Sequence, residues 1–564
     1  MLRSIPALCL VFLVPSILAQ QAGTPIGEND SGISLRVTTR LVVVDTVVTD
    51  KQGHPVNDLK ADEVAVLEDG KPQKLGLFSR VPDAAENSRP AADPLPPNVF
   101  SNRPEYHHPT GPPVLLLLDV LNSQLLDQAR VRQRALRYLA EQAKAKRRIA
   151  ILALINDLVV LQDFSSDPEV LAAAIEKLSP QKAVAATRGE PFTITPQMAA
   201  GLTANMLNSL KRLNQEQAVN SVDDRVRITL SSLNAIARAM IGYPGRKNLV
   251  WVSAGFPVSL VLEGRHSDLS RSYSKDVLET ATLLSEAQVA VYPVDSRGLP
   301  GGLRQSSDSG ELVPTIVAPE ESGGADDPLI NSTQVTDASH MAMEQMARGT
   351  GGKAFYNAND LDRAVASSIA DGSSYYALGY YPENKKWDGK YRKISVKIRR
   401  KGLMTRYRKG YYAFDSVTAI KPLGQSQLQD RLKELQKAAS DPLPATGVTF
   451  KAQVKPPKPG DKNTDINLVV DSASISFTEA SPDRHKCDLD FAAFLVAADG
   501  ASTARVHKNL VSLLPAEQYS DVRLHGLPFH FQLEAAPTGG ELRLVIRDNQ
   551  TGLIGTLSIA LKGD

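Results

Sequence analysis

The chain has 564 residues, of which 42% are hydrophobic and 22% are charged, and its formal net charge is +2. This composition is typical of a soluble globular protein with three or four domains and excludes a chain that is disordered or embedded in a membrane. Because the charges nearly balance, no strong overall field would draw the protein to nucleic acid or to a membrane surface.

The first nineteen residues, 1–19, have the pattern of a secretory signal peptide. Arg3 provides the positive start, residues 8–14 the apolar core and Ala19 the small residue before the cleavage site. No other run approaches the roughly 18 apolar residues that a membrane span needs. Cleavage would leave one cysteine, Cys487, which cannot form an internal disulfide. An export signal without disulfides predicts a periplasmic or secreted bacterial protein.

Residues 33–80 predict a β-sandwich-like module. Valine and leucine alternate loosely with polar residues, and the sequence at 50–53 predicts a tight turn in which Gly53 has a positive φ. Residues 81–112 contain many Pro, Ala and Asn and predict a linker.

The stretch PVLLLLDVLNS at 113–123 begins an α/β domain that we expect over 113–372. Five apolar residues lead directly into Asp119, as in a strand that is buried on both faces. A carboxylate just past the carboxyl end of such a strand lies at the edge where open α/β sheets bind their ligands.

Strands and helices alternate through the rest of this domain. Apolar strands are expected at 148–154, 158–162, 248–253 and 289–295, and helices at 125–144, 168–178, 226–241 and 275–287. This alternation predicts a doubly wound, Rossmann-like parallel sheet. Two segments do not fit the pattern: 180–224 predicts an insertion with its own helix at 202–217, and 299–337 predicts a mobile surface loop.

Residues 373–414 predict a basic, tyrosine-rich β-hairpin. Eight of the fifteen tyrosines lie here, and Ile394, Val396 and Ile398 share one strand face while Lys397 and Arg399 share the other. Residues 404–412 are expected to pair with this strand. Residues 415–446 predict a helical linker, and the strand-rich tail at 447–564 predicts a second β-sandwich.

The order of these segments resembles that of the VWFA-related proteins found mainly in acidobacteria. The matching motifs include LLLLDVLNS, NLVWVSAGFP, VAVYPVDSRGL and SYYALGYYPENKKWDGKYRKISVKIRRKG, and together they cover most of residues 35–413. The resemblance implies a von Willebrand A-like central domain flanked by β-sandwich-like domains, in an exported protein of unassigned role.

A von Willebrand A domain binds a divalent cation through an Asp-x-Ser-x-Ser loop and two further loops. The resemblance places this loop at Asp119, Leu121 and Ser123, so leucine replaces the middle serine, and at the third loop Ala254 replaces an aspartate after Ser253. Only Asp119 and Ser123 remain as metal ligands, which implies at most a weakly held cation such as Mg²⁺ and otherwise no cofactor. The alternative is that both residues hydrogen-bond the loop and cap the following helix.

Two candidate surfaces follow from these observations. The degenerate adhesion site comprises Asp119, Asn122, Ser123 and Ser253. The second candidate is a patch for anionic surfaces on the basic hairpin, formed by Lys397, Arg399, Arg406 and Arg408. A solvated strand face packed from below by tyrosines is the alternative interpretation of that patch.

We therefore expect an exported, non-enzymatic protein-binding or adhesion and scaffold protein. Its partner would be another protein or an envelope polymer; no nucleic acid and no membrane span are expected. The alternative is an exported hydrolase whose site is assembled from residues distant in sequence, because the chain has neither a Gly-x-Ser-x-Gly nor a His-Glu-x-x-His motif.

Overall fold

The computed structural model describes most of the chain beyond residue 40. The described residues are 41–81, 93–107, 113–123, parts of 128–139, 148–178, 202–253, 273–295, 304–305, 312–313, 328–356, 374–414, 425–455, 463–481, 483–496, 502–534 and 540–560. All of them belong to one unit, Leu41–Asp564. The expected signal peptide lies outside the described residues.

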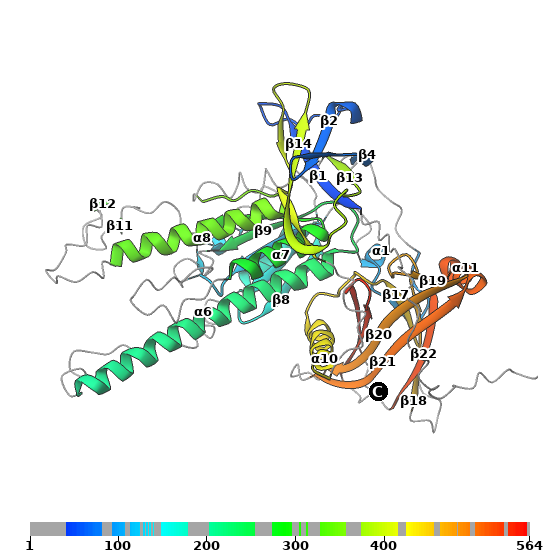
Figure 1. Ribbon diagram of the computed structural model, residues 1–564. Coiled ribbons are helices and arrows are strands. Elements are labelled where there is room, and N and C mark those ends of the chain that lie inside the picture. Colours follow the sequence, from blue (N-terminus) through cyan, green and yellow to red (C-terminus); the bar gives the residue numbers. More distant parts are fainter. Residues whose placement is uncertain are drawn as a thin grey trace, which may run out of the picture. The chain divides into compact units, whose positions relative to one another are not determined.

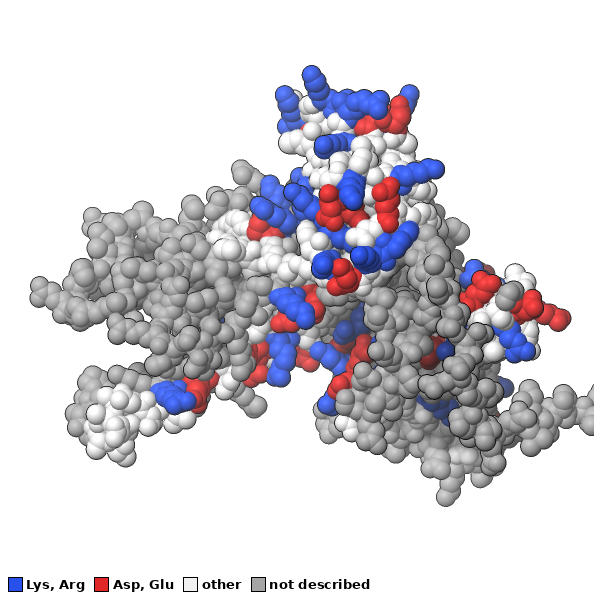
Figure 2. Space-filling view, viewed as in Figure 1, with Lys and Arg blue, Asp and Glu red and all other residues white. Residues whose placement is uncertain are grey.

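Eight strands from two distant parts of the chain form one β module (Figure 1). They are β1 (Val42–Thr49), β2 (Val64–Glu68), β3 (Lys71–Gln73), β4 (Leu75–Val81), β13 (Tyr375–Tyr380), β14 (Asp388–Ile398), β15 (Met404–Arg406) and β16 (Gly410–Phe414), with a 3₁₀ turn, η1 (Ala61–Glu63), before β2. They form two sheets, in the orders β15-β1-β13-β4 and β16-β14-β2-β3. Lys and Arg side chains gather on this module (Figure 2).

The strands expected at 33–80 and at 373–414 thus share both sheets, which corrects their division into a module and a separate hairpin. A two-stranded hairpin alone is only marginally stable in water, so each part needs the other to complete its core. Residues 404–412 were expected to pair with β14. This is confirmed for the part in β16, whereas the part in β15 pairs with β1 instead. The turn at 50–53 is confirmed, with Gly53 at a φ of 91°.

A buried ion pair lies in the core of the β module. The guanidinium of Arg392 is 3.3 Å from the carboxylate of Glu68, and both side chains are almost fully buried. The hydroxyls of Tyr380 and Tyr411 each donate a 2.8 Å hydrogen bond to Glu68 Oε2. The tyrosines therefore satisfy a buried charge as well as filling the core.

The α/β domain contains a five-stranded sheet. Its strands are β6 (Val114–Asp119), β7 (Ile149–Leu154), β8 (Leu158–Ser165), β9 (Lys247–Ser253) and β10 (Val289–Asp295), in the order β10-β9-β6-β7-β8. Counted along the chain, the third, second, first, fourth and fifth strands lie side by side, which is the strand order of doubly wound sheets. The sheet is parallel except for β8, which runs antiparallel to β7. The expectation of a fully parallel sheet is wrong there, because only three residues join β7 to β8 and a parallel crossover needs many more.

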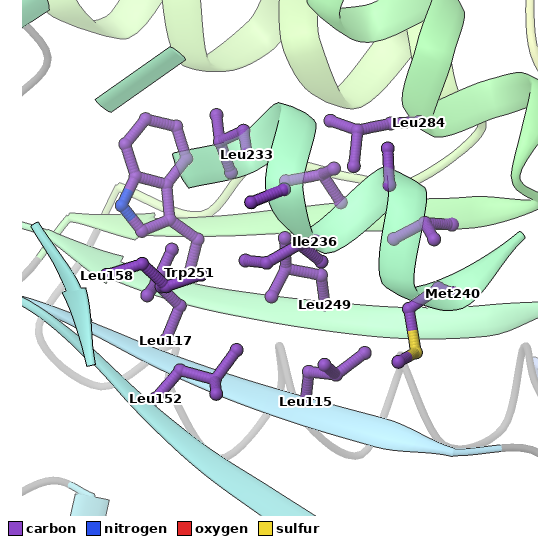
Figure 3. Packing of buried hydrophobic residues seen from close by; sticks show 14 of the residues in the cluster. Leu115, Leu117, Leu152, Leu158, Leu233, Ile236, Met240, Leu249, Trp251 and Leu284 are labelled. Atoms are coloured by element: carbon purple, nitrogen blue, oxygen red, sulfur yellow. The ribbon is translucent and has the colours of Figure 1, made fainter. Parts of the chain in front are cut away.

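Helices pack against both faces of this sheet. On one face, Leu115, Leu117 and Trp251 pack against α6 (Ala204–Met240), α7 (Ser274–Glu286) and α8 (Pro328–Thr350) (Figure 3). On the other face, Leu116 and its neighbours pack against α3 (Pro168–Glu176) and against the helical residues Val131, Ala135 and Leu139. Because side chains alternate along a strand, each strand contributes to both cores.

Two helices are longer than expected. The 37-residue α6 joins the helix expected inside the insertion at 180–224 to the next one, since no Gly or Pro interrupts 204–240. Likewise, α8 begins at Pro328, inside the expected loop at 299–337, and proline is favoured at a helix start. Two short strands, β11 (Arg304–Gln305) and β12 (Leu312–Val313), also lie in that segment. Among the described residues, no helix is long and apolar enough to cross a membrane.

The C-terminal domain is a β-sandwich. Its strands are β17 (Phe450–Lys455), β18 (Asn463–Val470), β19 (Thr478–Ser481), β20 (Arg484–Val496), β21 (Ser502–Pro515), β22 (Leu527–Glu534), β23 (Glu541–Asp548) and β24 (Ile554–Ala560), accompanied by α10 (Gln425–Ser440) and α11 (Ala516–His525). Cys487 lies in its core, where burial raises the pKa of the thiol to about 11. Cys487 is therefore a small buried apolar residue of the sandwich core.

The expected linker at 81–112 contributes to this sandwich. Its strand β5 (Val99–Ser101) pairs with β17, and a short helix, α1 (Pro104–His107), follows. The buried side chain of Asn102 donates to the carbonyls of Ala445 (3.0 Å) and Val448 (2.8 Å) and accepts from the amide of Phe450 (2.8 Å). This part of the linker is therefore an integral strand, which local composition could not reveal.

Candidate functional site

The carboxylate of Asp119 lies at the carboxyl end of β6, where the strand order reverses between β6 and β9. It is fully buried. Its Oδ1 accepts the backbone N–H of Asn122 at 3.0 Å, and its Oδ2 accepts the Asn122 amide at 2.9 Å. The same Oδ2 accepts the indole N–H of Trp251 at 3.1 Å and the hydroxyl of Ser253 at 2.8 Å. Internal donors therefore engage both carboxylate oxygens.

Trp251 can reach Asp119 because of the alternation along β9. Leu249, Trp251 and Ser253 share the face that packs against the helices, and Leu117 and Asp119 share the same face of β6. The indole ring is fully buried and lies among Leu117, Leu158 and Leu233 (Figure 3). A ring enclosed in this way cannot turn its N–H away from the carboxylate without disrupting the core.

The buried charge of Asp119 is compensated in two ways. Burial raises the pKa of the Asp119 carboxyl, while the hydrogen bonds from Asn122, Ser253 and Trp251 act in the opposite direction and favour the carboxylate. Arg225, half-buried on α6, adds a nearby positive charge. Burial lowers the pKa of Arg225, and attraction to Asp119 opposes that shift.

Asn122 connects this carboxylate to α6. Its amide also donates to the hydroxyl of Thr229 at 2.9 Å, and that hydroxyl donates to the carbonyl of Arg225 at 2.8 Å. The loop after β6 is therefore fastened to the helix that covers this face of the sheet. The result is a preorganised polar network whose side chains have little freedom to move.

The geometry does not suit a cation held by Asp119 and Ser123. The Ser123 hydroxyl donates to the backbone carbonyl of Asp119 at 2.5 Å, and Leu121 is buried in the apolar core. Oδ2 of Asp119 already accepts hydrogen bonds from Asn122, Trp251 and Ser253, which occupy the lone pairs that a cation would need. No group of three or more His, Cys, Asp or Glu side chains that could hold a metal occurs in the described part of the chain. These contacts favour the loop-bonding interpretation; Ala254 and the residues after Ser123 that would form the cap lie outside the described residues.

A second pair at the same sheet edge is missing from the sequence-based predictions. Asp295 ends β10 and is paired in register with Ser253. Its buried carboxylate is 2.7 Å from Nε2 of His340 on α8. The ring of Tyr356 lies 4.3 Å from the imidazole, and its hydroxyl donates to Glu344 at 3.0 Å. A polar residue directly after the apolar run VAVYPV was the available signal for Asp295, whereas nothing local indicates His340.

The predicted adhesion-site residues thus divide into two groups. Asp119, Asn122 and Ser253 meet through side-chain contacts, whereas the Ser123 hydroxyl donates to the backbone carbonyl of Asp119. The sequence-based site omits Trp251 and Thr229, although both contribute to it. Apolar strand patterns do not reveal which tryptophan N–H will face a carboxylate.

The predicted anionic-surface patch is only partly a surface. Lys397 is exposed on β14, and Arg399 is exposed just after its end. Arg406 is half-buried on β15, which belongs to the other sheet. Arg408 is also half-buried: it donates to the hydroxyl of Ser285 at 2.8 Å and to the carbonyl of Val43 at 2.7 Å. Including Arg408 in the patch was therefore wrong, because this residue ties the β module to α7.

Comparison with known proteins gives distant structural likenesses. No family model and no curated protein matches the chain. An aerotolerance-related membrane protein from Bacteroides fragilis, mutated at several positions to serine, is 16% identical with a TM-score of 0.25, over 46% of this chain and 98% of that one. The pilus adhesin SpaC from Lactobacillus rhamnosus GG is 8% identical with a TM-score of 0.25, and the match covers 80% of this chain and 53% of SpaC. A von Willebrand factor type A protein from Catenulispora acidiphila is 6% identical with a TM-score of 0.21, and the match covers 90% of this chain and 75% of that protein. At TM-scores this low, the likenesses by themselves assign neither a fold nor a function.

Proposed function

We propose that this chain is an exported, non-enzymatic binding or scaffold protein built around a von Willebrand A-like α/β domain. Its protein partner docks on the surface that covers the carboxyl edge of the five-stranded sheet, where Asp119, Ser253 and Asp295 are buried, and no metal ion bridges the contact. Export rests on the signal-peptide pattern at 1–19. The strand order supports the assignment to an open α/β domain. It also supports the docking position, because ligands of such sheets bind where the strand order reverses.

One observation carries the metal-free part of the proposal. Both oxygens of Asp119 accept hydrogen bonds from buried internal donors, among them the indole of Trp251. Mg²⁺ requires near-octahedral oxygen coordination, and a carboxylate already engaged in this way is a poor ligand. Rigid polar networks of this kind suit a preformed docking surface.

Thermal unfolding tests the metal-free contact. A ligand that binds only the folded state stabilises it by about 2.7 kcal/mol at a hundredfold excess over its dissociation constant. We expect millimolar Mg²⁺, Mn²⁺ or Ca²⁺ to leave the melting temperature unchanged relative to EDTA. A saturable increase of several degrees that disappears in Asp119→Ala would overturn the proposal.

Photo-crosslinking in cells tests the docking edge itself. A photoreactive residue at Met341, which is 73% exposed beside His340 on α8, should capture a protein partner equally with Mg²⁺ and with EDTA. The matched control is Lys433 on α10, whose side chain is 76% exposed and which should capture none. Capture at Met341 that requires Mg²⁺, or equal capture at both positions, would contradict the proposed mode of binding.

The hydrolase remains the second candidate, and the Asp295–His340 pair is the observation in its favour. A buried carboxylate that orients an imidazole is a common element of general-base catalysis. Among the described residues, however, no serine, threonine or cysteine side chain is hydrogen-bonded to His340. Cleavage of chromogenic esters, phosphoesters or glycosides that disappears in His340→Ala would favour this candidate over the binding protein.

A further inference from the structure

The outer face of the sheet β16-β14-β2-β3 carries a row of exposed side chains. Along β14 the buried residues Arg392, Ile394 and Val396 alternate with residues that point away from the core. The exposed members of that outer row are Tyr391, Lys393 and Lys397, and the exposed Arg399 follows directly after the end of the strand. At about 3.4 Å per residue, the two lysines lie about 14 Å apart along the strand.

The fold does not use the charges of these three cations. Within the described residues, Lys393, Lys397 and Arg399 form no ion pair. By contrast, the neighbouring Arg392 pairs with Glu68, and Arg400 pairs with Glu63 and Asp58. The basic run of the sequence is therefore divided into structural arginines and a row of cations available to a ligand.

Tyr391 is placed as a fixed aromatic platform at one end of the row. Its side chain is 44% exposed, and its ring lies 5.1 Å from that of Tyr412, its cross-strand partner on β16. A Cβ at Gly410 would come within 2.3 Å of the Tyr391 ring, so only glycine lets the ring lie against the β16 backbone. The ring is held in position before any ligand arrives, which lowers the entropy cost of binding.

We propose that this face, defined by Tyr391, Lys393, Lys397 and Arg399, binds an acidic polysaccharide. The cations follow one another along β14 and just past its end, so together they can meet several carboxylates repeated along an extended chain. The negative face of the tyrosine ring attracts the weakly positive C–H groups of a sugar ring. A site that recognised charge alone would not need this aromatic ring. The Lys and Arg side chains that gather on the β module are visible in Figure 2. This surface is separate from the α/β edge, so the inference goes beyond the proposed function.

The test uses the full chain and fluorescently labelled polygalacturonate, with dextran, polyglutamate, duplex DNA and anionic phospholipid vesicles as comparison probes. We expect polygalacturonate to bind, dextran not to bind, and the binding to weaken with salt as the screening length falls from about 10 Å at 0.1 M. Each cation removed near an anionic surface weakens binding roughly fivefold. The triple variant Lys393→Gln/Lys397→Gln/Arg399→Gln should therefore weaken binding of polygalacturonate about a hundredfold. The control Arg212→Gln/Lys275→Gln/Lys433→Gln removes three other highly exposed cations and should stay within twofold of the wild type.

Tyr391→Ala separates sugar recognition from simple charge attraction. It should weaken polygalacturonate at least fivefold while leaving polyglutamate binding unchanged, and melting temperatures would confirm that the variants remain folded. Absence of polygalacturonate binding by the wild type would overturn the inference. So would equal losses in the two triple variants, a Tyr391→Ala variant that binds normally, or tighter binding of DNA, polyglutamate or vesicles than of polygalacturonate.

Discussion

Replacing Trp251 with phenylalanine removes one donor from the Asp119 carboxylate and keeps most of the aromatic bulk. A hydrogen bond to a charged group contributes about 1.5–3 kcal/mol. At about 24 cal/mol per Å³, a residual cavity of about 40 Å³ would add about 1 kcal/mol. Because the indole is fully buried and its Nε1 lies 3.1 Å from Oδ2, we expect Trp251→Phe to destabilise the α/β domain by about 2.5–4 kcal/mol.

A double-mutant cycle separates the hydrogen bond from the cavity. Trp251→Phe is measured alone and in the Asp119→Ala background, where no carboxylate remains to accept the bond. The coupling free energy should be about 1.5–3 kcal/mol, because the cavity term is present in both backgrounds and cancels. Trp387→Phe, at the other tryptophan of the chain, is the matched control and should leave the α/β domain unaffected.

Native-state hydrogen exchange of the β6 and β9 amides is the suitable assay. A chain with several domains does not unfold in one step, so a global midpoint would mix separate transitions, whereas exchange reports the opening free energy of each strand. A coupling free energy below about 0.5 kcal/mol would refute the reasoning. It would mean that the indole N–H does not stabilise the Asp119 carboxylate.

Three further predictions concern the rest of the molecule. Burial lowers the pKa of Lys247 from 10.5 to about 7, so between these pH values the unfolded chain holds a proton that the folded chain has released. The free energy of unfolding should therefore rise between about pH 7 and 10, and melting curves of Lys247→Met should show a smaller rise. Glu68→Leu leaves the buried Arg392 without its ion-pair partner and should destabilise the β module by about 3–5 kcal/mol in urea unfolding. Glu63→Gln, which loses a partly exposed pair, should have a much smaller effect. Asn102→Ala leaves three buried backbone groups without a partner at about 1–3 kcal/mol each, so limited proteolysis should cleave the C-terminal sandwich much faster than in wild type; an unchanged rate would contradict this.

Local sequence patterns predicted the central part of this protein well. The apolar run before Asp119 is a strand whose six residues are all buried, and the expected strands at 148–154, 248–253 and 289–295 are present. Such runs are informative because a strand covered on both faces must be apolar along its whole length. The resemblance to von Willebrand A domains placed Asp119, Asn122 and Ser253 in one site, and these three residues do meet, since the carboxyl ends of neighbouring parallel strands lie at one edge.

Tertiary structure alone decided how the outer parts are combined. The β module joins strands that are more than three hundred residues apart, as in the pairing of Val66 with Val396, and β5 pairs with a strand of the C-terminal sandwich. Main-chain hydrogen bonds between strands carry almost no sequence signature, so alternation predicts a strand and its face but not its partner. The same limit applies to the site: the indole of Trp251 and the imidazole of His340 reach their carboxylates only because packed elements from distant parts of the chain bring them there.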